Sequence, residues 1–143
     1  MNMKMIVCGY DGSEHAMKAA VMAAEMAKKF EARLGLLYVV EPYAPPVDLP
    51  GISFVDWIEP HRKAALRMIA DAATSIAERT GVTPETEVRV GGAANELTHF
   101  SQEKQADLVV VGSRGLGAVK RMLLGSVAGR VVHQSAAPVL VVH

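Results

Sequence analysis

Cysteine is almost absent from this sequence, because Cys8 is the only one among 143 residues. No disulfide can form within the chain, and a lone thiol inside an apolar run behaves as an inert core residue. Long apolar runs are missing too: none approaches the roughly 20 residues that a membrane-spanning helix needs. The apolar stretch near the N-terminus is too short for a secretory signal. These absences predict a soluble, cytoplasmic protein with no membrane partner.

Net charge is also absent, because 15 basic residues balance 15 acidic ones. A protein that binds polyanions in general needs a positively charged surface, so nucleic acid is not an expected partner. The charge is unevenly distributed, however: no carboxylate follows Asp107, whereas four Lys or Arg residues do. A locally positive C-terminal quarter in a neutral chain suits a small anionic ligand. Alternatively, this uneven charge distribution arises by chance in a short segment and has no functional meaning.

The sequence does contain a regular alternation of two hydrophobic patterns. Short apolar runs predict five strands, over 3–10, 32–40, 85–92, 106–113 and 137–143. Stretches with helical spacing predict four helices, over 11–30, 58–80, 94–105 and 126–135. Strands that alternate with helices predict an α/β fold with a parallel sheet. We expect one doubly wound domain over 1–143, with helices on both faces of a five-stranded sheet in the order 3-2-1-4-5.

Two details of this pattern bear on a site. Residues 41–60 hold five of the seven prolines, which predicts a long loop or lid, because proline removes a backbone donor and restricts φ. Either Asp11 or Ser13 can cap the helix that follows the first strand, and Asp11 with Glu14 has the spacing of a capping box. Capping does not prevent Asp11 from also touching a ligand.

The most informative stretch is VVVGSRGLGAVKRMLLGSVAGRVV, residues 109–132. Glycines at 112 and 115 let the main chain approach a ligand closely. Gly125 and Ser126 then open a helix, whose exposed N–H groups and dipole favour an anion. Arg114, Lys120 and Arg121 add positive charge nearby. The alternative, that these glycines only make turns, does not explain why serine follows both Gly112 and Gly125.

Other phosphate motifs fail here. A Walker motif needs lysine after Gly117, where this chain has Ala118, and the first strand is not followed by a three-glycine dinucleotide fingerprint. The pattern Gly112-x2-Gly115-x9-Gly125-Ser126 instead resembles the ATP-binding branch of the universal stress protein family, whose signature is G-x2-G-x9-G-[ST]. The resemblance extends over essentially the whole chain, from IVCGYDGSEHAMKAA through LYVVEP to SAAPVLVV.

This resemblance implies an adenine nucleotide-binding fold, related to the adenine-nucleotide alpha hydrolases, and ATP or another adenine nucleotide as the ligand. It implies that Mg²⁺ is bound mainly through the phosphates, and that a homodimer forms through the last strand, 138–143. That strand is apolar and uncharged, as an edge strand that invites pairing would be. Carried over by position, Asp11 and Val39 border the base and ribose, Val111 and Gly112 lie against the ribose, and Gly115, Gly125, Ser126 and Val127 hold the phosphates.

Three functions are compatible with these residues. The first is a nucleotide-dependent regulatory protein of a stress response, with at most slow hydrolysis, because no base that could activate water is evident. The second is an ATP-dependent enzyme with another substrate, and the third is a dimeric interaction module that needs no nucleotide. The five histidines lack metal-ligand spacing, so no metal held by side chains is expected. Arg114 can point either to phosphate or to solvent, and the role of Tyr10 stays open.

Overall fold

The computed structural model describes residues 2–42, 50–115 and 124–143. Strands and helices alternate along the chain, as the hydrophobic pattern predicts. The strands are β1 (Met5–Gly9), β2 (Arg33–Val40), β3 (Glu85–Val90), β4 (Leu108–Gly112) and β5 (Val139–Val142). The helices are α1 (Glu14–Phe30), α2 (Phe54–Thr80), α3 (Ala93–Glu103) and α4 (Ser126–Gln134).

The five strands form one parallel sheet in the order β3-β2-β1-β4-β5, which confirms the predicted fold. β1 lies at the centre, where Ile6 pairs with Leu34 on one side and with Leu108 on the other. Its first four residues are buried, and so are those of β4. Helices cover both faces of a sheet of this kind, which is why its central strands are continuous apolar runs in the sequence.

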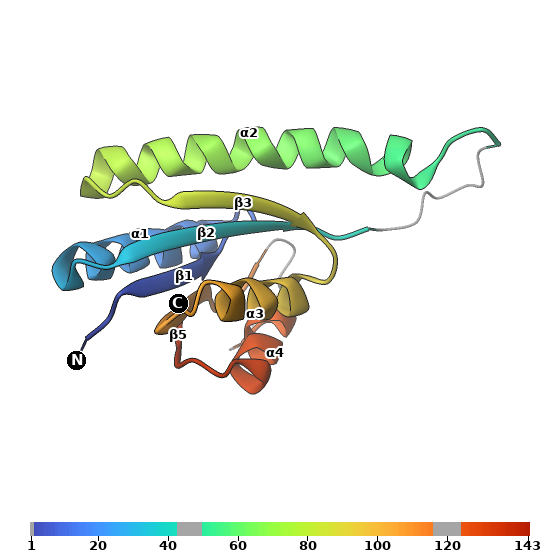
Figure 1. Cartoon of the computed structure of the whole chain (residues 1–143). Helices are drawn as coiled ribbons and strands as arrows, with labels where there is room; N and C mark the ends of the chain where they lie inside the picture. The colour runs from blue at the N-terminus through green and yellow to red at the C-terminus, as the bar shows by residue number, and fades with distance from the viewer. Residues whose placement is uncertain (1, 43–49, 116–123) are drawn as a thin grey trace.

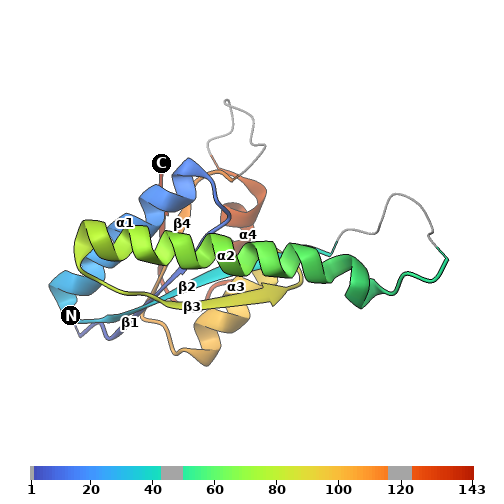
Figure 2. The ribbon, with the colours of Figure 1, turned by 90° about the horizontal axis from the view of Figure 1, so that it is seen from above.

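Two helices cover each face of the sheet (Figure 1). Helices α1 and α2 lie side by side on one face, as the view from above shows (Figure 2), and α3 and α4 pack together on the other. The face of α1 that meets the sheet is made of small side chains, so the helix packs closely against the strands. Its buried residues are Ala16, Ala19, Ala20, Ala23, Ala24 and Ala27.

Helix α2 begins at Phe54, earlier than the predicted start at residue 58, and the last part of the predicted loop 41–60 is therefore helical. Ser53 caps this helix by accepting a hydrogen bond from the N–H of Asp56 at 3.2 Å. Pro60 lies inside the helix and cannot donate to the carbonyl of Asp56. Both residues are exposed, so water can reach that carbonyl. Residues 43–49 of the predicted lid lie outside the described residues.

Cys8 is fully buried in the centre of β1, as the sequence predicts. Burial raises the pKa of its thiol to about 12, because the core cannot solvate a thiolate. The thiol is therefore unreactive at neutral pH. Within the described part of the chain, no helix has the length and apolar composition that crossing a membrane requires.

Candidate functional site

Two loops meet at the carboxyl edge of the sheet, because β1 and β4 are neighbours. The chain leaves β1 through Asp11 and leaves β4 through Gly115. These residues are far apart in sequence, yet a Cβ added to Gly115 would overlap a carboxylate oxygen of Asp11. This contact lies where the strand order reverses, which is the usual ligand site of a doubly wound sheet.

A cleft of about 720 Å³ opens at this edge. All the residues that the sequence marks as ligand contacts line it: Asp11, Val39, Val111, Gly112, Arg114, Gly115, Gly125, Ser126 and Val127. They come from four separate parts of the chain, which only the sheet order brings together. Their individual contacts with a ligand stay predictions.

Residues from α2 also line the cleft, which no feature of the sequence predicted. They are His61, Ala64, Ala65 and Met68. Met68 packs against the loop after β1, since a Cβ added to Gly12 would lie 2.9 Å from its sulfur atom. Nothing local in the α2 sequence distinguishes these residues from ordinary helix positions, and only the packing of α2 over the end of the sheet brings them to the cleft.

Two tyrosines lie between α2 and the sheet in this part of the cleft. The rings of Tyr10 and Tyr38 meet edge to face, with their centroids 6.5 Å apart. Burial raises the pKa of both phenols, and the Asp11 carboxylate raises each further. Tyr10, whose role the sequence left open, is thus a neutral, half-buried wall of the cleft.

The backbone of β2 faces the cleft at Val39. The carbonyl of Leu37 accepts a hydrogen bond from the N–H of Tyr10 at 2.9 Å, and the carbonyl of Val40 accepts one from Gly91 at 3.0 Å on the opposite side. Backbone groups alternate along a parallel strand, so the N–H and C=O of Val39 face the same side as those of Leu37. At that level β1 has already ended at Gly9, so one donor and one acceptor of Val39 face the cleft.

Asp11 and Ser13 have separate roles at the start of α1. The Ser13 hydroxyl accepts a hydrogen bond from the N–H of Ala16 at 3.1 Å and is the N-cap. Asp11 instead accepts from the N–H of Ser13 at 2.9 Å, so the predicted pairing of Asp11 with Glu14 in a capping box does not form. This turn holds the carboxylate of Asp11 at the cleft, next to Gly115.

The start of α4 offers unsatisfied backbone donors. Helices α1 and α2 are both capped by a serine hydroxyl, whereas the N-caps of α3 and α4 are Gly92 and Gly125, which have no side chain to accept a hydrogen bond. The first turn of α4 also has no acidic residue. Its N–H groups and the positive end of its dipole therefore face the cleft, where an anion would bind.

The side chain of Arg114, in the segment that follows β4, contacts helix α1. Its Nη2 lies 3.0 Å from Nε2 of His15, and because arginine can only donate, this histidine nitrogen is the acceptor. His15 thus holds a guanidinium at the wall of the cleft. Lys120 and Arg121, the other basic residues predicted near a phosphate, lie outside the described residues.

The fold is that of a doubly wound α/β protein, with a cleft where the strand order reverses. The sequence pattern of the universal stress protein family matches residues 2–143. A universal stress protein of Methanocaldococcus jannaschii is 39% identical over 139 residues, which cover 97% of this chain and 81% of that protein. The chain belongs to the universal stress protein family.

Solved structures agree with this assignment. Universal stress protein UspA from Lactobacillus plantarum shares the fold with a TM-score of 0.87, at 22% identity and with 100% of this chain and 99% of that chain covered. A universal stress protein crystallised in complex with cAMP has a TM-score of 0.73 at 27% identity, with 100% and 98% covered.

Proposed function

We propose that this protein binds an adenine nucleotide, ATP foremost, in the cleft at the carboxyl edge of the sheet. The observation that carries the proposal is the uncapped start of α4, which opens onto the same cleft as Gly112 and Gly115. Backbone N–H groups at a helix start, with glycines that let the ligand approach, suit phosphate. The family member solved with cAMP supports an adenine nucleotide as the ligand class.

The two ends of the nucleotide would meet different walls. The backbone N–H and C=O of Val39 form a donor and acceptor pair suited to the edge of the adenine base, beside Asp11. The ribose would lie against Val111 and Gly112. The phosphates would then reach the groups at the start of α4 and its loop, which are Gly115, Gly125, Ser126 and Val127, with Arg114 adding charge.

A divalent cation would enter with the phosphates. Among the described residues, no group of three or more His, Cys, Asp or Glu side chains could hold a metal ion. Mg²⁺ commonly keeps several waters and binds nucleotides through phosphate oxygens.

For the protein as a whole, we propose a regulatory role in a stress response. The protein would respond to bound nucleotide, with at most slow hydrolysis.

Two measurements test this function directly. Mass spectrometry of the small molecules released when the purified protein is denatured should detect an adenine nucleotide. Added ATP with Mg²⁺ should raise the melting temperature, since a ligand at a hundredfold excess over its Kd stabilises the native state by about 2.7 kcal/mol. If the purified protein retains no nucleotide and no adenine nucleotide raises its melting temperature, the proposal is contradicted. That result would favour a module that works without nucleotide.

We further propose a homodimer through β5, which forms an edge of the sheet. The carbonyls of Pro138 and Val142 accept hydrogen bonds from the N–H groups of Val109, in β4, and of Ser113, just after it. By alternation, the main-chain groups of Val139 and Val141 face outward. An uncharged edge of this kind can pair with the same strand of a second copy around a two-fold axis.

Val141→Pro should convert the dimer to a monomer. Proline removes an outward-facing N–H but no bond to β4, and proline is tolerated at strand edges. Light scattering after size-exclusion chromatography measures the mass, and Val141→Ala is the control, because it keeps that donor. A wild-type monomer, or a dimer that survives Val141→Pro, would show that β5 is not the interface.

A further inference from the structure

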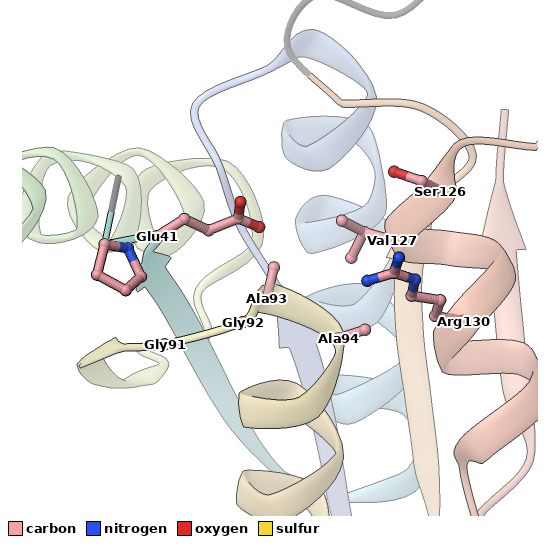
Figure 3. Close-up of a pocket in the computed structure, with 9 residues that line it drawn as sticks. Glu41, Gly91, Gly92, Ala93, Ala94, Ser126, Val127 and Arg130 are labelled. Carbon is pink, nitrogen blue, oxygen red and sulfur yellow. The ribbon is translucent and has the colours of Figure 1, made fainter. Parts of the chain in front are cut away.

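A second pocket of about 410 Å³ adjoins the cleft on the α3 and α4 side of the sheet (Figure 3). Ser126 and Val127, at the start of α4, line both spaces. Arg130 lines only the smaller pocket. A ligand held in the cleft would therefore meet Arg130 only if it extends past Ser126.

The position of Arg130 on α4 directs its side chain into this pocket. Arg130 lies four residues after Ser126, so the two share one face of the helix. Side chains on a helix lean toward its N-terminus, which brings a long side chain back over the first turn. Figure 3 shows the guanidinium of Arg130 directed into the pocket, beside Val127 and below the Ser126 hydroxyl.

Helix α4 itself carries no negative charge beside Arg130. Arg130 is the fifth residue of α4 and is exposed, so the positive end of the dipole disfavours its charge only because the side chain leans back over the first turn, which has no acidic residue to offset it. No ion pair or hydrogen bond joins Arg130 to another side chain in the part of the chain that the structure describes. A bound anion would offset both positive charges.

The opposite wall of the pocket is acidic. The carboxylate of Glu41, just after β2, faces the pocket across from Arg130 (Figure 3). Glu96, in the first turn of α3, is paired with Arg89 at 3.8 Å and packs over Gly91. The start of α3, whose N-cap Gly92 also has no side-chain hydrogen bond, lies on that wall, but Arg130 is the one cationic side chain among the described residues that line the pocket. An anionic group would therefore bind on the α4 side, next to Arg130 and Ser126.

We propose that Arg130 binds the second and third phosphates of an adenine nucleotide. This contact would make the protein prefer adenosine di- and triphosphates to the monophosphate. The proposal rests on the nucleotide-binding function above and deepens it. A monophosphate ends at the groups formed by Gly112, Gly115, Gly125 and Ser126. A longer polyphosphate passes Ser126 and reaches the guanidinium, whose planar fork can donate two hydrogen bonds to phosphate oxygens.

The test compares AMP, ADP, ATP and inorganic tripolyphosphate by isothermal titration calorimetry, at a constant Mg²⁺ concentration, on the full chain. Arg130→Gln should weaken ADP, ATP and tripolyphosphate binding about tenfold or more, because each lost bond is charge-assisted, and should change AMP binding less than twofold. Arg130→Lys should fall between the two, since it keeps the charge but not the fork. Arg79→Gln removes an equal charge from the last turn of α2, outside both pockets, and should change nothing.

The outcomes separate this inference from the proposed function. If both Arg130 variants bind all three nucleotides with wild-type affinity, or if their affinity for AMP falls as much as their affinity for ATP, Arg130 does not discriminate between nucleotides by the number of phosphates. The proposed nucleotide binding would still stand in either case. If the wild type binds tripolyphosphate through Arg130 but no nucleotide, the anion site survives and the proposed function fails. If the wild type binds none of the four, both fail.

Discussion

Replacing Gly115 and Gly125 together by valine is expected to abolish the rise in melting temperature that ATP produces. A Cβ at Gly115 would displace the carboxylate of Asp11, and one at Gly125 would lie 3.1 Å from the Ser113 carbonyl, at the start of α4. Both changes fill the space through which phosphate would approach the backbone N–H groups. The wild-type rise at a hundredfold excess of ATP over its Kd should be roughly 5–12 °C for a domain of this size.

The double variant is informative only if it folds. The clash at Gly115 is with the end of a side chain that can rotate, and neither glycine has a positive φ. A Cβ at Gly125 would meet main-chain atoms of Ser113 and Arg114 at 3.1 and 3.3 Å, so the double variant should be less stable than the wild type, and its melting transition without ligand shows whether it folds. Gly129→Ala is the matched control, because Gly129 lies on α4 but does not line the cleft. Differential scanning fluorimetry with and without ATP compares the three proteins. A full ATP shift in the folded double variant would show that these glycines do not form the phosphate site.

Gly112→Ala is expected to lower the free energy of unfolding by about 3 kcal/mol, even without ligand. A Cβ at this position would lie 2.8 Å from the carbonyl carbon of His15 and 3.1 Å from the backbone nitrogen of Ala16. These are main-chain atoms of α1, so the helix itself would have to move away from the end of β4. The approach of α1 to the sheet here requires a residue without a side chain.

Urea denaturation of the unliganded protein measures this effect. Gly129→Ala again provides the comparison, with the same change of atoms in a different environment. Among the described residues, the new Cβ there would meet Leu124 alone, at 3.6 Å, which is an ordinary contact. Because alanine has a higher helix propensity than glycine, this variant should be more stable than the wild type by roughly 0.5–1 kcal/mol. Equal effects at the two positions would mean that α1 does not restrict Gly112.

The position of Arg114 shows how the cleft depends on contacts between distant segments. Arginine in a glycine loop has many conformations of similar energy, and the sequence allowed it to face either phosphate or solvent. In the fold, Nε2 of His15 accepts a hydrogen bond from its guanidinium at 3.0 Å. This bond keeps the positive charge at the cleft before any ligand binds, which lowers the entropic cost of ordering the side chain on binding.

The amino-acid sequence by itself determined the order of strands and helices. The hydrophobic periods are local, so each strand and most helix boundaries could be predicted within a few residues. The start of α2 could not, because Pro60 and the prolines before it are typical of a loop, whereas the Ser53 cap and the exposure of Pro60 allow a helix. The spacing of Gly112, Gly115 and Gly125 is local too, and it indicated a phosphate loop before any fold was known.

Only the tertiary structure decided which distant residues share a surface. Strand order brings Asp11 beside Gly115, the crossing of α2 over the end of the sheet adds Met68 to the cleft, and the face of α4 that meets the small pocket holds Arg130. No window of sequence contains these relations, because each depends on how helices pack against both faces of one sheet. Local chemistry specifies what each segment can become, and long-range packing specifies what it meets.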